Sequence, residues 1–293
     1  MKKARKFLIL FLCFALAGSL FSCNTASEEE TAAPTESEVP TETEAPTEAP
    51  TEKATKKQTE KKEEQKYLFS LKFGSYNIAA GRNVDLDFTV IGNDIKTQGL
   101  DIVGLQEVDQ FTARSGGQDT IKIISESSGL PYYQFFKAID YQGGEYGVGI
   151  LSKYPILEYE HEQLDSQGFE QRIWGHALID VNGTHIDFFV THLSYEDMAL
   201  NALQTEALIE KVSQYENFVL TGDFNTSNFE AYYVDHKFGA VNNGAYKVPT
   251  FNSDTIDNII YRREAWKFEK PLSLPNGHSD HNMIYATAHF IVK

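Results

Sequence analysis

A stretch without large apolar side chains, residues 24–66, confines the folded part of this chain to the residues that follow it. The stretch is built almost entirely from Thr, Glu, Pro, Ala, Ser and Lys. Because such a composition cannot bury enough apolar surface to offset the entropy lost on ordering, we predict a disordered tether here. Residues 67–293 are rich in Phe, Tyr, Ile and Val and contain no second low-complexity break. This block is therefore predicted to form one sizeable domain with its own core.

The first 23 residues have the layout of an export signal. Basic residues within the first six positions precede an apolar run at 7–16, which is too short to span a membrane comfortably. The ending Leu20-Phe21-Ser22-Cys23 resembles a bacterial lipobox, although Phe21 departs from the residue type usual at its position. We therefore expect an exported protein whose Cys23 carries a lipid that anchors it in the cell membrane, with the domain facing outside. Plain secretion and an uncleaved anchor are the alternatives.

The chain is acidic, with a formal net charge of −16, most of which falls within residues 67–293. An acidic surface repels polyanions at long range, which argues against a general high-affinity nucleic-acid binder. It does not exclude a nuclease, because cations and a few local basic side chains can serve one phosphate.

The cysteine content limits the metal chemistry of the domain. The two cysteines of the chain, Cys13 and Cys23, both lie in the predicted signal, so the domain has no thiol for a disulfide or a thiolate metal site. A metal would have to be held by carboxylate, amide or imidazole groups. Those ligands favour a hard ion such as Mg²⁺, Mn²⁺ or Ca²⁺.

Hydrophobic periodicity predicts alternating strands and helices. Asn182-Gly183 between two apolar runs is a strong hairpin signal, and Gly99 is the expected end of a helix. The predicted strands are 69–77, 102–105, 148–151, 177–181, 185–190, 218–220 and, as the last two, 256–261 and 283–292; the predicted helices are 84–95, 120–128 and 200–208. Residues able to bind metal or phosphate recur where these strands end, with His192 just past one of them.

Six short blocks carry these residues: Ser75-Tyr76-Asn77-Ile78, Leu105-Gln106-Glu107-Val108-Asp109, Val190-Thr191-His192-Leu193, Thr221-Gly222-Asp223-Phe224-Asn225, Ile256-Asp257-Asn258-Ile259-Ile260 and Gly277-His278-Ser279-Asp280-His281. In this order and spacing they resemble the endonuclease/exonuclease/phosphatase superfamily, which includes nonspecific DNases, abasic-site endonucleases, inositol-phosphate phosphatases and bacterial sphingomyelinases. The resemblance implies a four-layer α/β sandwich, in which two mixed, largely antiparallel sheets pack face to face with helices outside. It also implies a monomeric, divalent-metal-dependent hydrolase of phosphate esters.

The chemistry of phosphate-ester cleavage accounts for the blocks. It needs a cation on the developing charge, an oriented water and donors to the nonbridging oxygens. Glu107 is the natural main metal ligand, and the resemblance places Asn77 and Asp280 at the metal site as well. It implies that Asp223 orients or activates the water and that Asn225 binds the phosphate.

Two histidines complete the predicted catalytic set. His281 would transfer a proton or stabilise phosphate charge, with Asp257 fixing its tautomer, and the sequence leaves the choice between these roles open. His192 would donate a proton to the leaving oxygen or bind phosphate. Weaker candidates are Glu170, the loop 143–147, and Arg114 and Arg172, for which a surface salt bridge is an equally good interpretation; His278 is interpreted as a loop residue.

The sequence leaves the substrate open. A phosphodiester such as a lipid head group is favoured, and a nuclease or a phosphomonoesterase of the same family is the alternative. A membrane-active enzyme would show an exposed aromatic hairpin; Tyr132, Tyr133, Phe135 and Phe136 are aromatic enough, but core packing explains them as well. A catalytically silent surface lipoprotein that binds a ligand is the hypothesis from another class.

Overall fold

The computed structural model describes residues 66–233, 237–275 and 277–292. The predicted signal and tether, 1–23 and 24–66, therefore lie outside the described residues except for Lys66. The described elements are, in order, β1 (Tyr67–Asn77), η1 (Ala79–Val84), α1 (Phe88–Gln98), β2 (Ile102–Gln110), α2 (Thr120–Ser128), β3 (Tyr132–Tyr141), β4 (Gly144–Ser152), β5 (Ile156–Gln163), β6 (Ile173–Val181), β7 (Thr184–His192), α3 (Met198–Ser213), β8 (Val219–Asp223), α4 (Phe229–Tyr232), β9 (Phe238–Ala240), η2 (Gly244–Tyr246), β10 (Asp257–Arg262), β11 (Trp266–Phe268), β12 (Leu272–Leu274) and β13 (Met283–Ile291).

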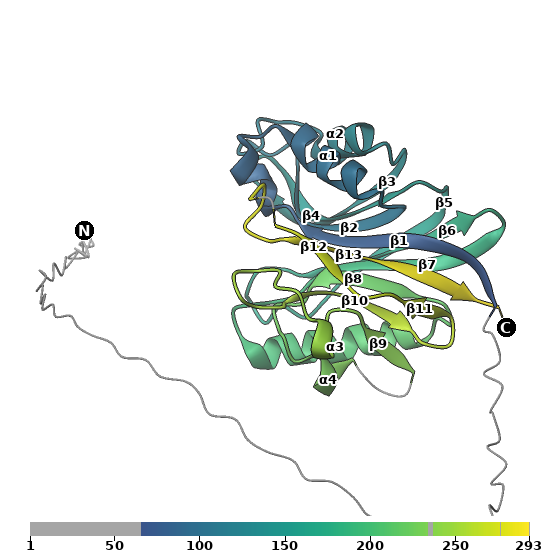
Figure 1. Cartoon of the computed structure of the whole chain (residues 1–293). Coiled ribbons are helices and arrows are strands. Elements are labelled where there is room, and N and C mark those ends of the chain that lie inside the picture. The colour runs from purple at the N-terminus through teal and green to yellow at the C-terminus, as the bar shows by residue number, and fades with distance from the viewer. Residues whose placement is uncertain (1–65, 234–236, 276, 293) are drawn as a thin grey trace, which may run out of the picture. The chain divides into compact units, whose positions relative to one another are not determined.

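Two β-sheets pack face to face, and helices cover their outer faces (Figure 1). The first sheet has the order β11-β13-β1-β2-β4-β3, with β12 also paired to β13, and the second has the order β5-β6-β7-β8-β10-β9. The β1–β2 and β7–β8 pairs are parallel, whereas the remaining pairs between the described strands are antiparallel. This arrangement confirms the predicted sandwich of two mixed, largely antiparallel sheets.

Three apolar layers hold the sandwich together, because each inner strand is covered on both faces. Phe188 points into the core between the sheets, where its ring stacks on Phe73 with centroids 5.8 Å apart. The next residue, Phe189, points the other way and packs with Leu208 of α3. Such strands read as continuous apolar runs, and burying one Phe side chain contributes about 1.5–3 kcal/mol.

The predicted helix at 84–95 begins later than expected, at Phe88. Asp85 and Leu86 have left-handed backbone angles (φ 48° and 63°), which no helix can accommodate. Asp87 then caps the helix by accepting a hydrogen bond from the Thr89 amide, and the helix ends as predicted at a left-handed Gly99. The predicted helices at 120–128 and 200–208 are confirmed as α2 and as part of α3.

Other differences concern strands. The predicted strand 102–105 continues to Gln110, and His192 is the last residue of β7 rather than a residue beyond it. The prediction that 256–261 and 283–292 are the last two strands was wrong, since β11 and β12 lie between them. Each of these strands has three residues, which is too short to display a period of two.

The two sheets approach closely at Gly104 of β2. A Cβ placed on Gly104 would lie 2.1 Å from Thr221 Oγ1 of β8 and 2.9 Å from Val190 Cγ2 of β7. Because Gly104 lies three residues before Glu107, and Thr221 two residues before Asp223, this contact sets how near the strand ends of the two sheets come to each other.

We therefore predict that Gly104→Ala lowers the free energy of unfolding by about 1–3 kcal/mol, because the added methyl overpacks the sheet interface. Thr221→Ala alone should cost about 1 kcal/mol, since Thr221 Oγ1 donates to the Phe189 carbonyl. Urea unfolding of both variants and of the double variant measures their coupling. The double variant should be more stable than the sum of the single effects predicts, by about 0.5 kcal/mol or more. Strict additivity would show that the added methyl group is accommodated by movement of residues other than Thr221.

Candidate active site

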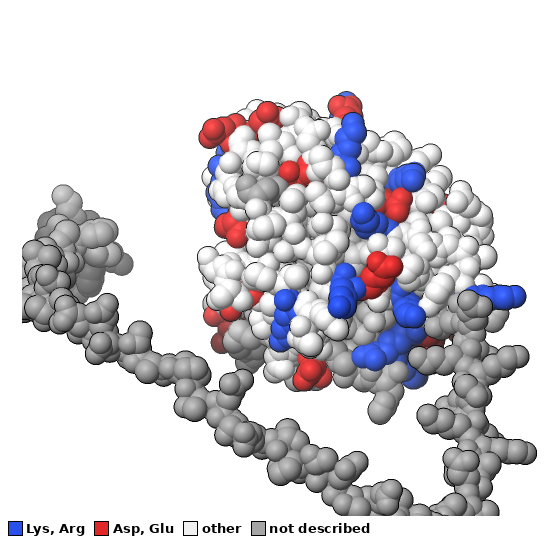
Figure 2. All heavy atoms as spheres, viewed as in Figure 1, with Lys and Arg blue, Asp and Glu red and all other residues white. Residues whose placement is uncertain are grey.

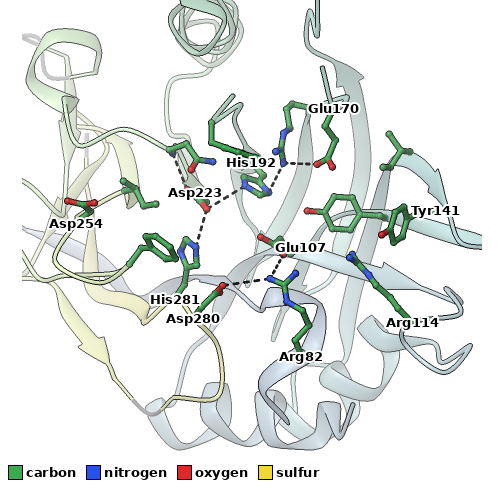
Figure 3. A pocket seen from close by; sticks show the side chains of 17 residues that line it. Arg82, Glu107, Arg114, Tyr141, Glu170, His192, Asp223, Asp254, Asp280 and His281 are labelled. Atoms are coloured by element: carbon green, nitrogen blue, oxygen red, sulfur yellow. Dashed lines mark hydrogen bonds and ion pairs between the residues drawn. The ribbon is translucent and has the colours of Figure 1, made fainter. Parts of the chain in front are cut away.

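A cavity of about 570 Å³ lies where the strand ends of both sheets meet. Figure 3 shows side chains from both sheets and from the loops after them pointing into this space. The cavity is lined by Arg82, Glu107, Arg114, Ile139, Tyr141, Tyr146, Glu170, Arg172, His192, Tyr195, Asp223, Asn225, Phe251, Asp254, Ile256, Asp280 and His281.

The structure brings the predicted site residues together. Those that line the cavity are Glu107, His192, Asp223, Asn225, Asp280 and His281. The other two, Asn77 and Asp257, are buried behind the wall and touch lining residues through hydrogen bonds. Their proximity is thus established by the fold, while their catalytic roles stay predictions.

An irregularity in β2 directs Glu107 toward the cavity. The pairing of β2 with β4 shifts register between Leu105 and Val108, and Glu107 between them has a φ of 55°. A bulge of this kind re-aims a side chain, and its left-handed residue costs about 1–3 kcal/mol of strain that the surrounding sheet must offset. Asn77 Nδ2, at the end of β1, donates to Glu107 Oε1 at 3.2 Å.

Asp223 lies at the centre of the polar network. Asn77 Nδ2 donates to its Oδ2 at 3.0 Å, and the Asn225 amide donates to its Oδ1 at 3.0 Å. Burial raises the pKa of Asp223 to about 7, helped by the negative charge of Asp257 and opposed by His281 and by these two hydrogen bonds. A carboxylate with such a pKa is suited to take a proton near neutrality.

His281 is held between two carboxylates. Its Nδ1 lies 2.8 Å from Asp257 Oδ2, the partner that the sequence predicts, and its Nε2 lies 3.6 Å from Asp223 Oδ2. Burial opposes a charge on this ring, but the charges of Asp257 and Asp223 outweigh burial and raise the pKa of His281 to about 9. The ring is therefore an imidazolium at neutral pH, with both nitrogens as donors.

His192 has the opposite electrostatic environment. Arg172 Nη1 lies 3.0 Å from His192 Nδ1, and since a guanidinium can only donate, Nδ1 accepts and the proton of the neutral ring resides on Nε2. Burial, followed by the charges of Arg172 and His281, holds the pKa of His192 well below its ordinary value. His192 Nε2 lies 3.5 Å from Asp223 Oδ2.

The arginines differ from their interpretation as surface salt bridges. Arg172 is buried beside His192, and its Nη1 lies 3.1 Å from Glu170 Oε1. Arg114 is largely covered, and its Nε and Nη2 donate to both oxygens of the buried Asp109 at 2.6 and 2.8 Å. His278 does not line the cavity; its Nδ1 lies 3.0 Å from Asp94 Oδ2.

Two groups of side chains can hold a cation. Asp223, Asp257 and His281 each place a possible ligand atom within 4.8 Å of the others, although the His281 ring would first have to lose a proton, and Asp257 Oδ1 is a buried oxygen for which the described residues provide no hydrogen-bond partner. The second group is Glu107 and Asp280, whose carboxylates both face the Nη2 atom of Arg82, at 3.5 and 3.7 Å. Both sets offer the hard oxygen donors that Mg²⁺ or Mn²⁺ prefers, so the residues fit a divalent metal.

Several lining residues were not predicted from the sequence, most notably Arg82. It follows the end of β1 by five positions, so the rule that site residues gather after strand ends applies to it. It was missed because no family block includes it. Its loop is strained: Ala79 and Ala80 are buried with φ values of 49° and 51°. Such backbone persists only where the surrounding structure enforces it, and it is common at functional sites.

Comparison with known proteins settles the family. Residues 74–281 match the sequence profile of the Endonuclease/Exonuclease/phosphatase family. The chain belongs to this family. Its members are metal-dependent phosphoesterases, and the buried cluster of Asp223, Asp257 and His281 is consistent with a metal site.

Individual relatives are distant. Protein cwh43 of Schizosaccharomyces pombe (strain 972 / ATCC 24843) is 30% identical over 119 residues, which make up 40% of this chain and only 12% of that protein. An endonuclease/exonuclease/phosphatase from Beutenbergia cavernae superposes with a TM-score of 0.65 at 18% identity, covering 75% of this chain and 72% of the other.

Two further solved structures share the fold. The mannosyl-6-phosphatase Bt3783 of Bacteroides thetaiotaomicron has a TM-score of 0.57 at 18% identity, covering 74% of this chain and 99% of its own. D. rerio TDP2 in complex with a single-strand DNA product has a TM-score of 0.60 at 18% identity, with coverages of 75% and 98%. At such identities the likeness shows the fold alone.

The charge of His281 can be tested in the metal-free protein. Asp257→Asn removes the largest of the influences that raise its pKa, so the effect of burial should lower the pKa of His281 by more than about one unit from about 9. NMR titration of the His281 ring in the variant and in the wild-type protein measures this difference. An unchanged His281 titration would show that Asp257 is not the source of the shift.

Proposed function

We propose that this protein is a divalent-metal-dependent phosphodiesterase, in which water attacks phosphorus with the help of Asp223 and the two histidines. The observation that carries the proposal is the position of these groups in the cavity. Asp223, His281 and His192 lie in its middle, with Asp254 on one side and Tyr141 and Arg114 on the other (Figure 3). A phosphorus atom held at the centre thus has room for an ester group on either side, as a phosphodiester requires.

The separations around Asp223 support a place for a phosphate oxygen or a water molecule. His281 Nε2 and His192 Nε2 lie 3.6 and 3.5 Å from Asp223 Oδ2, beyond the usual length of an N–H···O bond. Both N–H groups are therefore able to donate to an oxygen that enters between them. The neutral state of His192 favours phosphate binding over proton donation to the leaving group.

The proposed division of work follows from the charges. Asp223 accepts a proton from the attacking water, the imidazolium of His281 stabilises the negative charge that develops on the phosphate, and Asp257 orients that ring. Asn225 lies beside Asp223 with its Nδ2 donating to the Leu193 carbonyl at 2.9 Å, which fixes the amide at the cavity wall. These assignments favour the electrostatic role of His281 over the role of a base.

For the metal, we propose the position between Glu107 and Asp280, with Asn77 behind it. There a bound Mg²⁺ or Mn²⁺ would supply positive charge for the nonbridging oxygens and the departing oxygen. Glu107 and Asp280 line the cavity, whereas the carboxylate of Asp257 is already engaged with His281 and Asp257 does not line it. The chain's own residues thus divide into a cation-binding pair and a hydrogen-bonded proton-transfer cluster.

Surface charge bears on the choice of substrate. Acidic and basic side chains are scattered over the face in view in Figure 2 instead of forming one continuous basic band. Together with the net charge of −16, this favours a small ester over a long polyanion. Tyr132 and Tyr133 are partly exposed, at 41% and 37%, but do not line the cavity, while Phe136 is buried in the core.

We predict Mg²⁺- or Mn²⁺-dependent turnover of bis-p-nitrophenyl phosphate by the purified full chain. EDTA should abolish turnover, and His281→Ala should lower kcat by roughly 100-fold or more, because the variant loses the charge that faces the phosphate. His185→Ala is the matched control and should keep full activity, because His185 is exposed and lies at the start of β7, whereas the cavity residue His192 lies at its end.

A substrate panel separates the alternatives within the family. It compares p-nitrophenyl phosphate, inositol phosphates, a single-stranded oligonucleotide and sphingomyelin vesicles with the diester. Faster turnover of monoesters would establish a phosphomonoesterase, and faster cleavage of the oligonucleotide a nuclease. If a folded protein turned over none of them, the proposal would fail in favour of a catalytically silent binding lipoprotein.

We also propose that the domain works outside the cell, held to the membrane by a lipid on Cys23 and separated from it by residues 24–66. The support is the sequence of the first 66 residues, since the tether composition and the lipobox-like ending occur together. Among the described residues, no helix has the length and apolar character needed to cross a bilayer.

The anchor is tested by Cys23→Ser in a bacterial host. Wild type should fractionate with membranes and incorporate labelled palmitate, whereas the variant should lose the label and remain unprocessed or move to the soluble fraction. A wild-type chain that is soluble and unlabelled would show that the signal leads to plain secretion. The same labelled fraction in both proteins would show that Cys23 is not the anchor.

A further inference from the structure

Arg82 occupies the position in the cavity where two carboxylates converge. Its Nη2 lies 3.5 Å from Glu107 Oε2 and 3.7 Å from Asp280 Oδ2, so one guanidinium spans a pair of like charges (Figure 3). Glu107 comes from the first sheet and Asp280 from the loop before β13. Without a cation between them these carboxylates would repel each other, and Arg82 supplies that cation from the chain itself.

Of the three arginines that line the cavity, Arg82 is the most loosely held. Arg114 contacts Asp109 at 2.6 and 2.8 Å, and Arg172 contacts His192 and Glu170 at 3.0 and 3.1 Å. The contacts of Arg82 are longer, and its side chain is 53% exposed against 27% for Arg114 and 4% for Arg172. Exposed pairs of this length are weak, so Arg82 can leave its carboxylates at little cost.

The backbone of Arg82, in contrast, is fixed. The left-handed residues Ala79 and Ala80 precede it in a buried turn, and the Ala79 amide donates to Asn77 Oδ1 at 3.1 Å. Its neighbour Asn83 donates through Nδ2 to the Gly277 carbonyl at 3.4 Å, which joins this loop to the one that carries Asp280. A long side chain on a rigid base can therefore change its contact without leaving the cavity.

We propose that Arg82 neutralises the Glu107–Asp280 pair when no metal is bound, and that the side chain turns to the phosphate of the substrate once a divalent cation takes its position. This inference rests on the proposed function, because it takes the Glu107–Asp280 pair as the metal site.

The exchange follows from charge and distance. A divalent ion carries twice the charge of a guanidinium and approaches carboxylate oxygens to about 2.1 Å, so it outcompetes Arg82 for both carboxylates. The displaced guanidinium is then repelled by the ion and has lost its anionic partners. A phosphate ester in the same cavity offers two oxygens that match its planar fork. Metal loading thereby makes a phosphate-binding group available.

Opposite effects on metal and substrate binding distinguish this exchange from a structural role. In Arg82→Gln, Mn²⁺ should bind about three- to tenfold more tightly in the absence of substrate, as measured by EPR of free Mn²⁺, because no guanidinium competes. With saturating Mn²⁺, the same variant should have a KM for bis-p-nitrophenyl phosphate raised about tenfold or more. Arg82→Lys keeps the competing charge and should bind Mn²⁺ much as wild type does.

Two controls locate the effect. Lys153→Gln removes a cation of similar exposure, 59%, that pairs with Asp101 at 3.2 Å and does not line the cavity, so both Mn²⁺ affinity and KM should stay at wild-type values. Glu107→Gln should weaken Mn²⁺ binding at least tenfold, which shows that the measured ion occupies this pair.

Several outcomes would overturn the proposal. Unchanged or weaker Mn²⁺ binding in Arg82→Gln would contradict competition, and tighter Mn²⁺ binding with an unchanged KM would contradict the transfer to phosphate. If Glu107→Gln bound Mn²⁺ normally while Asp257→Asn did not, the ion would reside in the other cluster. A wild-type chain with neither Mn²⁺ binding nor turnover would instead refute the proposed function itself.

Discussion

The amide of Asn77 joins the two halves of the active site. It is fully buried at the end of β1 and donates from one nitrogen to Glu107 of its own sheet and to Asp223 of the opposite sheet. The carbonyl oxygen of its side chain accepts from the Ala79 amide and so also starts the turn that carries Arg82. The positions of Glu107, of Asp223 and of the turn that carries Arg82 therefore depend on one side chain, whose hydrogen bonds are made in a buried setting where an unpaired group is costly.

The close packing of the sheets makes this amide bridge possible. Gly104 and Thr221 touch where any side chain larger than hydrogen would separate β2 from β8. The apolar layers on both faces of each inner strand hold that spacing, since adjacent residues such as Phe188 and Phe189 anchor the same strand in different cores. Two histidines of different charge flank Asp223 at this junction: His281 is an imidazolium, and His192 is a neutral ring. The two histidines thus have opposite pKa shifts: burial, followed by the charges of Arg172 and His281, lowers the pKa of His192, whereas the carboxylates around His281 outweigh burial and raise its pKa.

The sequence predicts those parts of the structure that local chemistry determines. Asn182-Gly183 forms the expected hairpin turn with φ values of 53° and 91°, and the pairing of Asp257 with His281 follows from the family blocks. Three-residue strands and the bulge at Glu107 could not be predicted, because each depends on a neighbouring strand that is distant in sequence. The burial of Arg172 could not be predicted for the same reason, because its partners His192 and Glu196 come from the end of β7 and the segment after it. Whether a charged side chain is buried depends on contacts with other segments of the chain, and the residues next to it in sequence do not reveal those contacts.

The direction of β1 has a consequence for how substrate reaches the enzyme. The strand starts at Tyr67, which pairs with Ile291 near the end of the fold, and runs for 11 residues to Asn77 at the cavity. At about 3.3 Å per residue, the point where the chain enters the domain and the catalytic mouth are roughly 30 Å apart, at opposite poles of the sheet. Whatever precedes Tyr67 therefore joins the domain away from the opening of the cavity, so that the junction does not cover the route by which a molecule enters.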